Sequence, residues 1–93
     1  MSKVKVIRQP TAEATLIFEF ETASSEFLVK NFTDGDIYAS LERDATKEQS
    51  VLIPAQTAQR LQYGSYGGGK SNIVQIIPAE TSEKGVEVQC LKW

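Results

Sequence analysis

The stretch from Gly64 to Ser71 is the strongest candidate for chemistry in this sequence. It reads Gly-Ser-Tyr-Gly-Gly-Gly-Lys-Ser and matches G-x-x-x-x-G-K-[ST], a pattern whose backbone N–H groups and lysine hold nucleotide phosphates. A working phosphate loop lies between a strand and a helix, and the first turn of that helix faces the phosphates. Here residues 73–77 are mostly β-branched and end at Pro78, which predicts a strand instead. We therefore interpret the match as coincidental, expect no cofactor, and expect a flexible glycine-rich hairpin loop.

Carboxylates are the second candidate for chemistry. Asp34 and Asp36 form the tightest pair, and Glu42, Asp44 and Glu48 follow. Paired carboxylates serve glycoside hydrolysis or calcium binding, but the spacing does not fit a calcium-binding loop and no insertion is available to form a cleft. Aspartate beside glycine is typical of a turn in which the side chain accepts from its own backbone. We expect turn residues and no metal site.

Nucleophilic catalysis lacks a partner in this sequence. Cys90 is the only cysteine and histidine is absent, so neither an internal disulfide nor the usual zinc site can form. A serine or cysteine nucleophile normally needs a histidine or a well-placed lysine as its base. We therefore expect a protein that is not an enzyme.

The composition is that of one folded domain. Of the 93 residues, 41% are hydrophobic and 24% are charged, which is ordinary for a globular chain. A chain of this size buries only roughly 60 to 65% of its unfolded surface, so two halves would each lack a core. We expect a single β domain over residues 1–93.

The charges and the first residues limit the partners. Ten Lys and Arg against twelve Asp and Glu give a net charge of -2, and the cations are scattered rather than clustered, so we expect no nucleic-acid partner. Lys3, Lys5 and Arg8 alternate, which is typical of a solvated strand or a blunted sheet edge. The start lacks the apolar core of a signal peptide, and no stretch approaches the ~20 apolar residues of a membrane helix. We expect a cytoplasmic protein with no membrane partner.

Alternation of apolar and polar residues recurs along the chain and predicts an all-β fold. In residues 14–21, for example, Ala14, Leu16, Phe18 and Phe20 share one face. The expected strands begin near Val4 and Val6 and continue at 14–21, 26–30, 36–41, 51–53, 57–63, 72–77 and 85–91. Such spacing predicts one small antiparallel β-sandwich, or a partly open barrel, of about seven strands.

Local sequence signals bear on the connection at Asp34–Gly35 and on residues 57–63. The Asp34–Gly35 pair is a strong turn signal and predicts that 26–30 and 36–41 form a hairpin. Residues 57–63 could form a short helix, but Ala58 and Leu61 supply too little apolar periodicity, and we expect a strand.

Several expected strands are apolar on both faces, notably 27–29, 51–53 and 73–77. The outward face of such a strand must be covered by a loop of the same chain or by another chain, and we favour another chain. The residues expected to contribute to this interaction surface are Leu28, Leu52, Tyr63, Tyr66 and Trp93.

The chain from Phe27 to Leu91 resembles the small accessory structural proteins of the virions of tailed phages and prophages. Three segments carry the resemblance: a strand, turn and Ile-Tyr strand at 29–38, an apolar segment with a proline at 51–55, and a closing strand of alternating valines at 85–91. The resemblance implies a capsid-decorating, head-tail or tail-associated subunit, with no catalytic residue. Its implied partners are copies of itself and other virion proteins, and its implied destination is the virion.

The sequence therefore predicts a non-enzymatic structural or assembly protein that acts through protein–protein contacts. The alternative is a small carbohydrate- or peptide-binding module in which Tyr63 and Tyr66 form an aromatic surface beside the glycine-rich loop. A third hypothesis, nucleotide binding, depends only on the 64–71 motif.

Overall fold

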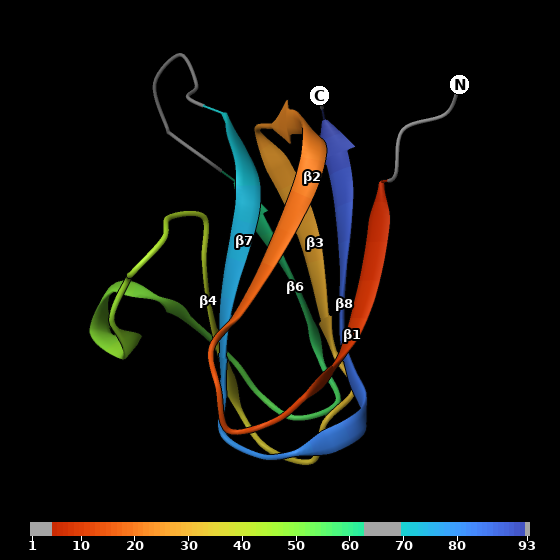
Figure 1. Cartoon of the computed structure of the whole chain (residues 1–93), viewed down its shortest axis with the longest axis vertical. Coiled ribbons are helices and arrows are strands. Elements are labelled where there is room, and N and C mark those ends of the chain that lie inside the picture. Colours follow the sequence, from red (N-terminus) through yellow and green to blue (C-terminus); the bar gives the residue numbers. More distant parts are fainter. Residues whose placement is uncertain (1–4, 63–69, 93) are drawn as a thin grey trace.

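The computed structural model describes residues 5–62 and 70–92, which form two four-stranded antiparallel sheets packed as a sandwich (Figure 1). Sheet A has the strand order β1 (Val6–Thr11), β8 (Ser82–Lys92), β3 (Glu26–Asn31), β6 (Ala58–Gln62). Sheet B has the order β2 (Leu16–Ser24), β7 (Ser71–Pro78), β4 (Ile37–Ser40), β5 (Val51–Ile53). One turn of 3-10 helix, η1 (Lys47–Gln49), precedes β5.

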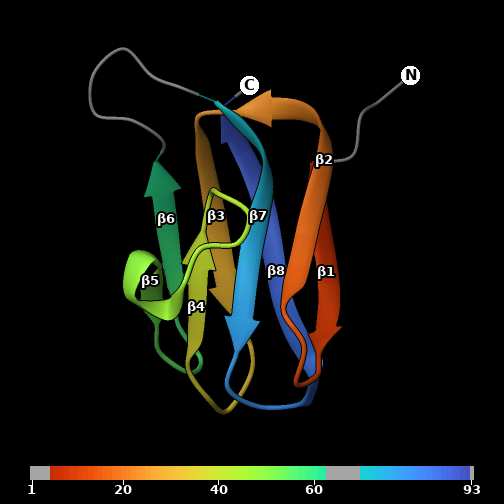
Figure 2. The ribbon, with the colours of Figure 1, turned by 60° about the vertical axis from the view of Figure 1, so that its left-hand side comes forward.

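Consecutive strands lie in different sheets, with the exception of the β4–β5 pair. The antiparallel pairs β1·β8, β2·β7, β3·β6 and β4·β5 are those of a long hairpin rolled into two layers, which is the jelly-roll arrangement. Each sheet therefore ends in two edge strands. β1 and β6 are the edges of sheet A, and β2 and β5 are the edges of sheet B, as Figure 2 shows.

The sandwich predicted from the sequence is confirmed, and a barrel is not formed because the two sheets remain separate. The described residues form eight strands where about seven were predicted, and β1 extends over Arg8, Gln9 and Pro10, which carry no apolar alternation. The strand predicted at 57–63 is confirmed as β6. The strand predicted after the glycine-rich motif is also confirmed, as β7.

The predicted hairpin between residues 26–30 and 36–41 is wrong, because β3 and β4 belong to different sheets. The tight hairpin turn expected for an Asp-Gly pair needs positive φ, and Gly35 does not adopt it. The strands on either side of the glycine-rich segment, β6 and β7, belong to different sheets and so do not form the expected hairpin. Residues 64–69 of this segment lie outside the described part of the chain.

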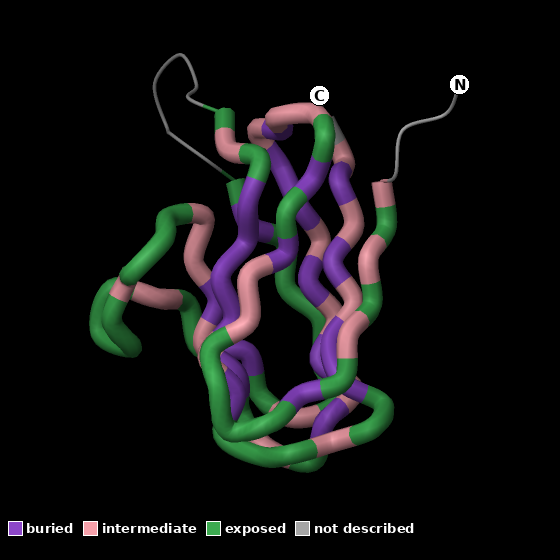
Figure 3. The backbone as a smooth tube through the Cα atoms, viewed as in Figure 1, coloured by how far each residue is buried: buried purple, intermediate pink, exposed green. Residues whose placement is uncertain are grey.

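The core lies between the two sheets and is built by alternation. On β8, Val86 and Val88 are buried while Glu87 points outward, and Phe18, Phe27 and other inward residues complete the core. Figure 3 shows buried positions alternating with more exposed ones along the strands. A ring contact of 5.6 Å between the centroids of Phe20 and Phe27 joins the two sheets.

Asn31 holds the turns at one end of the sandwich. Its side chain is 1% exposed, and its Nδ2 lies 2.9 Å from the carbonyl oxygen of Gly35 and 3.1 Å from those of Ile53 and Pro54. Its Oδ1 accepts from the backbone N–H and the hydroxyl of Thr33. One buried amide therefore joins the β3–β4 connection to the β5–β6 connection, which fixes where β6 begins.

Candidate functional site

The residues selected from the sequence do not form one surface in the described structure. Leu28 is half-buried on the outer face of sheet A, between buried Phe27 and Val29, whereas Leu52 is 48% exposed on β5 of sheet B. The outer faces of the two sheets point in opposite directions, so Leu28 and Leu52 cannot contact one flat partner together. Tyr63, Tyr66 and Trp93 lie outside the described residues.

The chain itself covers much of the outer face of sheet B. The amide side chain of Gln75, 3% exposed, accepts from the backbone N–H of Asp44 at 2.6 Å and donates to the carbonyl of Ala45 at 2.8 Å. It thereby holds the β4–β5 connection across the sheet, in front of β7 in Figure 2. Ile73 on the same face is 5% exposed. A loop, rather than the other chain we favoured, is thus what covers this apolar strand.

Two further contacts hold this connection. Arg43 lies 3.8 Å from the carboxylate of Glu19 on β2, and the ammonium of Lys47 lies 5.4 Å from the centroid of the Tyr38 ring on β4. Gln75 interrupts the apolar run 73–77, and a polar residue at that position was the signal in the sequence that a loop would be bound there.

The outer face of sheet A is polar and its charges are paired. Glu87 on β8 accepts from Arg8 on β1 at 2.8 Å and from Lys30 on β3 at 3.3 Å, while Arg60 on β6 lies 3.0 Å from Glu26 on β3. The hydrogen bond from Arg8, together with Lys30, holds the pKa of Glu87 below its ordinary value despite partial burial. Cross-strand charge pairs stabilise this face, on which Leu28 is half-buried and Val6 is 47% exposed.

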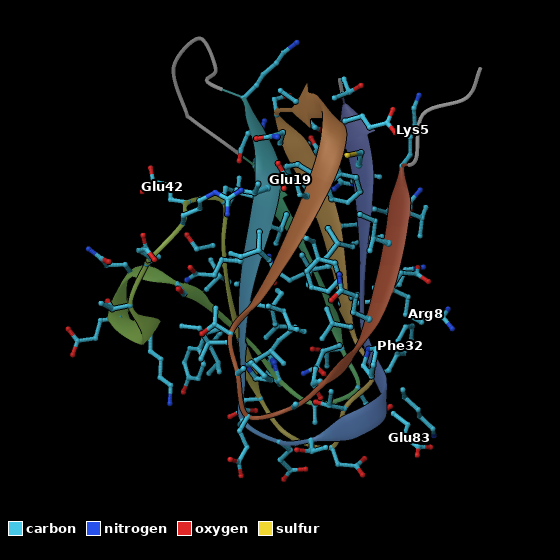
Figure 4. All side chains as sticks on the ribbon, in the orientation of Figure 1. Lys5, Arg8, Glu19, Phe32, Glu42 and Glu83 are labelled. Atoms are coloured by element: carbon cyan, nitrogen blue, oxygen red, sulfur yellow. The ribbon has the colours of Figure 1, made fainter. Side chains whose placement is uncertain are left out.

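A hollow of about 260 Å³ lies at one end of the molecule and is lined by Arg8, Phe32, Glu83 and Lys84. Figure 4 places the labelled Arg8, Phe32 and Glu83 near one another at this end. The guanidinium of Arg8 stacks 5.3 Å from the centroid of the Phe32 ring and is also paired with Glu87. Because Arg8 already contacts the Phe32 ring and the Glu87 carboxylate, its charge is not available to an anion in this hollow.

The second hollow lies between the edges of the two sheets, where β5 and β6 run on the same side of the sandwich. It has a volume of about 250 Å³. Its walls are the described residues Ser40, Leu41, Gln49 and Val51 of sheet B and its connection, and Gln59, Arg60, Leu61 and Gln62 of sheet A. Val51 is 43% exposed and Leu52 is 48% exposed, so apolar surface lies beside this groove. We call it the edge groove.

The free edge of β6 has a defined hydrogen-bonding pattern. The N–H of Asn31 donates to the carbonyl of Thr57 at 2.8 Å, so these two residues form a pair joined by backbone hydrogen bonds. In an antiparallel ladder every second pair is joined in this way, and the next such pairs between β3 and β6 are Val29 with Gln59 and Phe27 with Leu61. Gln59 and Leu61 therefore point their backbone groups at β3, while Ala58 and Arg60 point theirs away from the sheet. The side chain of Gln59 donates to the outward-facing carbonyl of Arg60 at 3.2 Å, in agreement with this alternation.

The candidates for catalysis are dispersed. Asp34 accepts from Gln56 at 3.2 Å rather than from its own backbone, and no group of three or more metal-binding side chains occurs among residues 5–62 and 70–92. In the 64–71 motif, Lys70 is exposed, and the Ser71 hydroxyl lies within 2.9 Å of the carbonyls of Leu41 and Ile73. The thiol of Cys90 is buried, and burial raises its pKa, which makes it a poor nucleophile at neutral pH.

The described ranges contain no helix that combines the length and the apolar character needed to cross a lipid bilayer. Comparison of the sequence and the structure with known proteins found no matching family model, no similar curated protein and no similar solved structure. The edge groove and the free edge of β6 are therefore the candidate site on geometric grounds alone.

Proposed function

We propose that this chain is a non-enzymatic assembly domain, a phage or prophage virion component, that binds protein partners along its β5–β6 edge. The observation that carries the proposal is the edge groove, where exposed Val51 and Leu52 lie beside a sheet edge whose backbone groups point outward. Apolar side chains at an open strand edge suit a protein partner, because the partner can add a strand and place alternate side chains in the groove.

Two further features support the virion role. The resemblance of residues 27–91 to accessory virion proteins implies a subunit that works by contact and symmetry. The jelly-roll arrangement also occurs in viral capsid domains, although it occurs in lectins and cupins as well, so this support is an analogy of fold.

The test compares the same substitution at two exposed valines. Val51→Lys places a charge in the edge groove, and Val6→Lys, at a position 47% exposed on β1, places it at the opposite edge of the sandwich. The partners offered are the purified products of the neighbouring genes and the chain itself, and complex formation is measured by light scattering. We expect Val51→Lys to weaken the complex by about tenfold or more, because the ammonium would have to be desolvated at the contact.

Val6→Lys should bind as the wild type does. Equal binding by both variants, or a loss confined to Val6→Lys, would contradict a site at the β5–β6 edge. If no offered protein forms a complex with the wild type, the assembly function itself is contradicted.

The alternative, a peptide- or carbohydrate-binding module, is favoured by one observation. The edge groove extends to Gln62, the residue immediately before Tyr63 in the sequence. Titration with short peptides and oligosaccharides, followed by tyrosine fluorescence, separates the two functions: saturable binding that survives in a monomeric chain would favour the module.

A further inference from the structure

Three of the edge strands carry features that oppose pairing with another strand. β1 contains Pro10, which has no N–H, and its register shifts between Gln9 and Thr11. β2 also shifts in register, between Glu19 and Ser24. β5 has only three residues and is followed by Pro54. Short length, proline and irregular register are the usual protection of an exposed edge.

β6 lacks these features along its five residues. It pairs with β3 in unbroken register from Glu26↔Gln62 to Lys30↔Ala58, and it contains no proline. Its one charged residue, Arg60, is paired with Glu26 at 3.0 Å. Four of its five residues are exposed, with Leu61 as the buried one. A regular, accessible and neutral edge is suited to accepting another strand.

We infer that β6 pairs antiparallel with β6 of a second copy of this chain, so that the two sheets A become one continuous sheet. The inference rests on the proposed assembly function and names its partner. A twofold axis through the new pair keeps the outer faces of the two sheets A on the same side of the joined sheet. Residues of the two β6 strands that lie opposite each other must then have their side chains on the same face.

The charges exclude the register that centres β6 on itself. If Arg60 lay opposite its own counterpart, two like charges would face each other, which is unfavourable. A shift that places Gln59 on the twofold axis sets Ala58 opposite Arg60 of the second copy. Both residues direct their backbone N–H and C=O groups away from β3, so they can exchange hydrogen bonds with the second copy, whose Ala58 N–H takes the place of the Gln59 side chain at the Arg60 carbonyl.

The edge suits a second copy better than an unrelated protein. The Gln59 amide both donates and accepts, so it is complementary to its own counterpart across a twofold axis. The pairing of Arg60 with Glu26 leaves no net charge that would select a charged partner. Joining the molecules at β6 also brings each edge groove, with Val51, toward the groove of the other copy.

The register is tested with single cysteines. Gln59→Cys should form a disulfide-linked dimer under mild oxidation, because residues opposite each other at a pair without backbone bonds have Cα atoms about 4.5 Å apart, within disulfide range. Thr57→Cys is the matched control on the same strand face, and its counterpart would lie about 13 Å away. Cys90 is buried and present in both. Equal cross-linking of the two variants would overturn the register.

The pairing itself is tested with Ala58→Pro, measured by sedimentation up to about 1 mM chain. The N–H at position 58 points away from β3, so proline removes no bond within one copy but blocks the second copy. We expect wild type and Ala58→Ser to dimerise, and Ala58→Pro to lose at least tenfold in affinity with an unchanged circular dichroism spectrum.

A wild-type chain that stays monomeric throughout, or an Ala58→Pro variant that dimerises like the wild type, overturns the inference. If the monomeric chain still binds a neighbouring gene product in a manner sensitive to Val51→Lys, the assembly function stands and only the second copy as partner is wrong. Failure of both kinds of binding contradicts both proposals.

Discussion

Asn31 is the residue on which the geometry of the β6 end of the molecule depends. Its buried amide serves the carbonyls of Gly35, Ile53 and Pro54 and accepts from Thr33. Its loss would remove a donor from the buried carbonyl of Ile53 and the acceptor of the Thr33 N–H, while the carbonyls of Gly35 and Pro54 keep the hydroxyls of Thr33 and Thr57.

We expect Asn31→Ala to lower the free energy of unfolding by about 2 to 4 kcal/mol, because the buried N–H of Thr33 and the carbonyl of Ile53 lose this partner together. Urea denaturation followed by circular dichroism measures this. Asp34→Ala is the control, since Asp34 is exposed and its one partner among the described residues is Gln56, and it should cost less than about 1 kcal/mol. Equal losses for the two variants would mean that Asn31 does not hold the turns together.

The strands of sheet A are joined on their outer face by Glu87, which bridges β1 and β3 from β8 through Arg8 and Lys30. The folded-state pKa of Glu87 lies below its ordinary value of 4.5, with the Arg8 hydrogen bond as the main cause. A lowered folded-state pKa contributes stability that is present above pH 4.5 and is lost as the pH falls below it through the folded-state pKa.

We therefore expect the unfolding free energy of the wild type to fall more steeply below pH 4.5 than that of Glu87→Gln, which has no carboxylate at this position. At neutral pH, Glu87→Gln should be less stable by about 0.5 to 1 kcal/mol, since the contacts are near the surface. Denaturation curves between pH 3 and pH 7, in low and high salt, check this. Parallel pH profiles for the two proteins would show that the bridge does not contribute.

The close approach of β1 to β8 depends on one glycine. Gly85 has φ of +65°, and a Cβ at this position would lie 1.8 Å from the backbone oxygen of Gln9. Its carbonyl accepts from the N–H of Phe32 at 3.0 Å. The left-handed backbone and the close approach of β1 explain why glycine stands where β8 meets the register shift of β1.

The fold of the whole molecule follows from its sequence more directly than the site does. Alternation in 14–21 and 85–91 marks the faces of β2 and β8, because one side of each strand meets the core. The assignment of strands to sheets does not follow, because it depends on long-range pairing. The hairpin expected at Asp34–Gly35 was wrong because Asn31 and Thr33 hold that turn in another geometry.

The edge groove could not be predicted from local patterns. Val51 and Leu61 are 10 positions apart, and they line one hollow only because β5 and β6 are edges on the same side of two sheets. Leu28 and Leu52 are apolar residues on the outer side of their strands, and they lie on opposite faces of the molecule because β3 and β5 belong to different sheets. The covering of Ile73 depended on Gln75, whose partners are Asp44 and Ala45.

Assembly of this molecule through the β6 edge can be observed with residue-resolved hydrogen exchange of backbone amides. In the free chain, the N–H groups of Gln59 and Leu61 should be protected by β3, and those of Ala58 and Arg60 should exchange fast. In the assembled state, the N–H groups of Ala58 and Arg60 should become protected while those of Gln59 and Leu61 change little. Protection that appears elsewhere, with Ala58 and Arg60 still exchanging fast, would contradict assembly through the β6 edge.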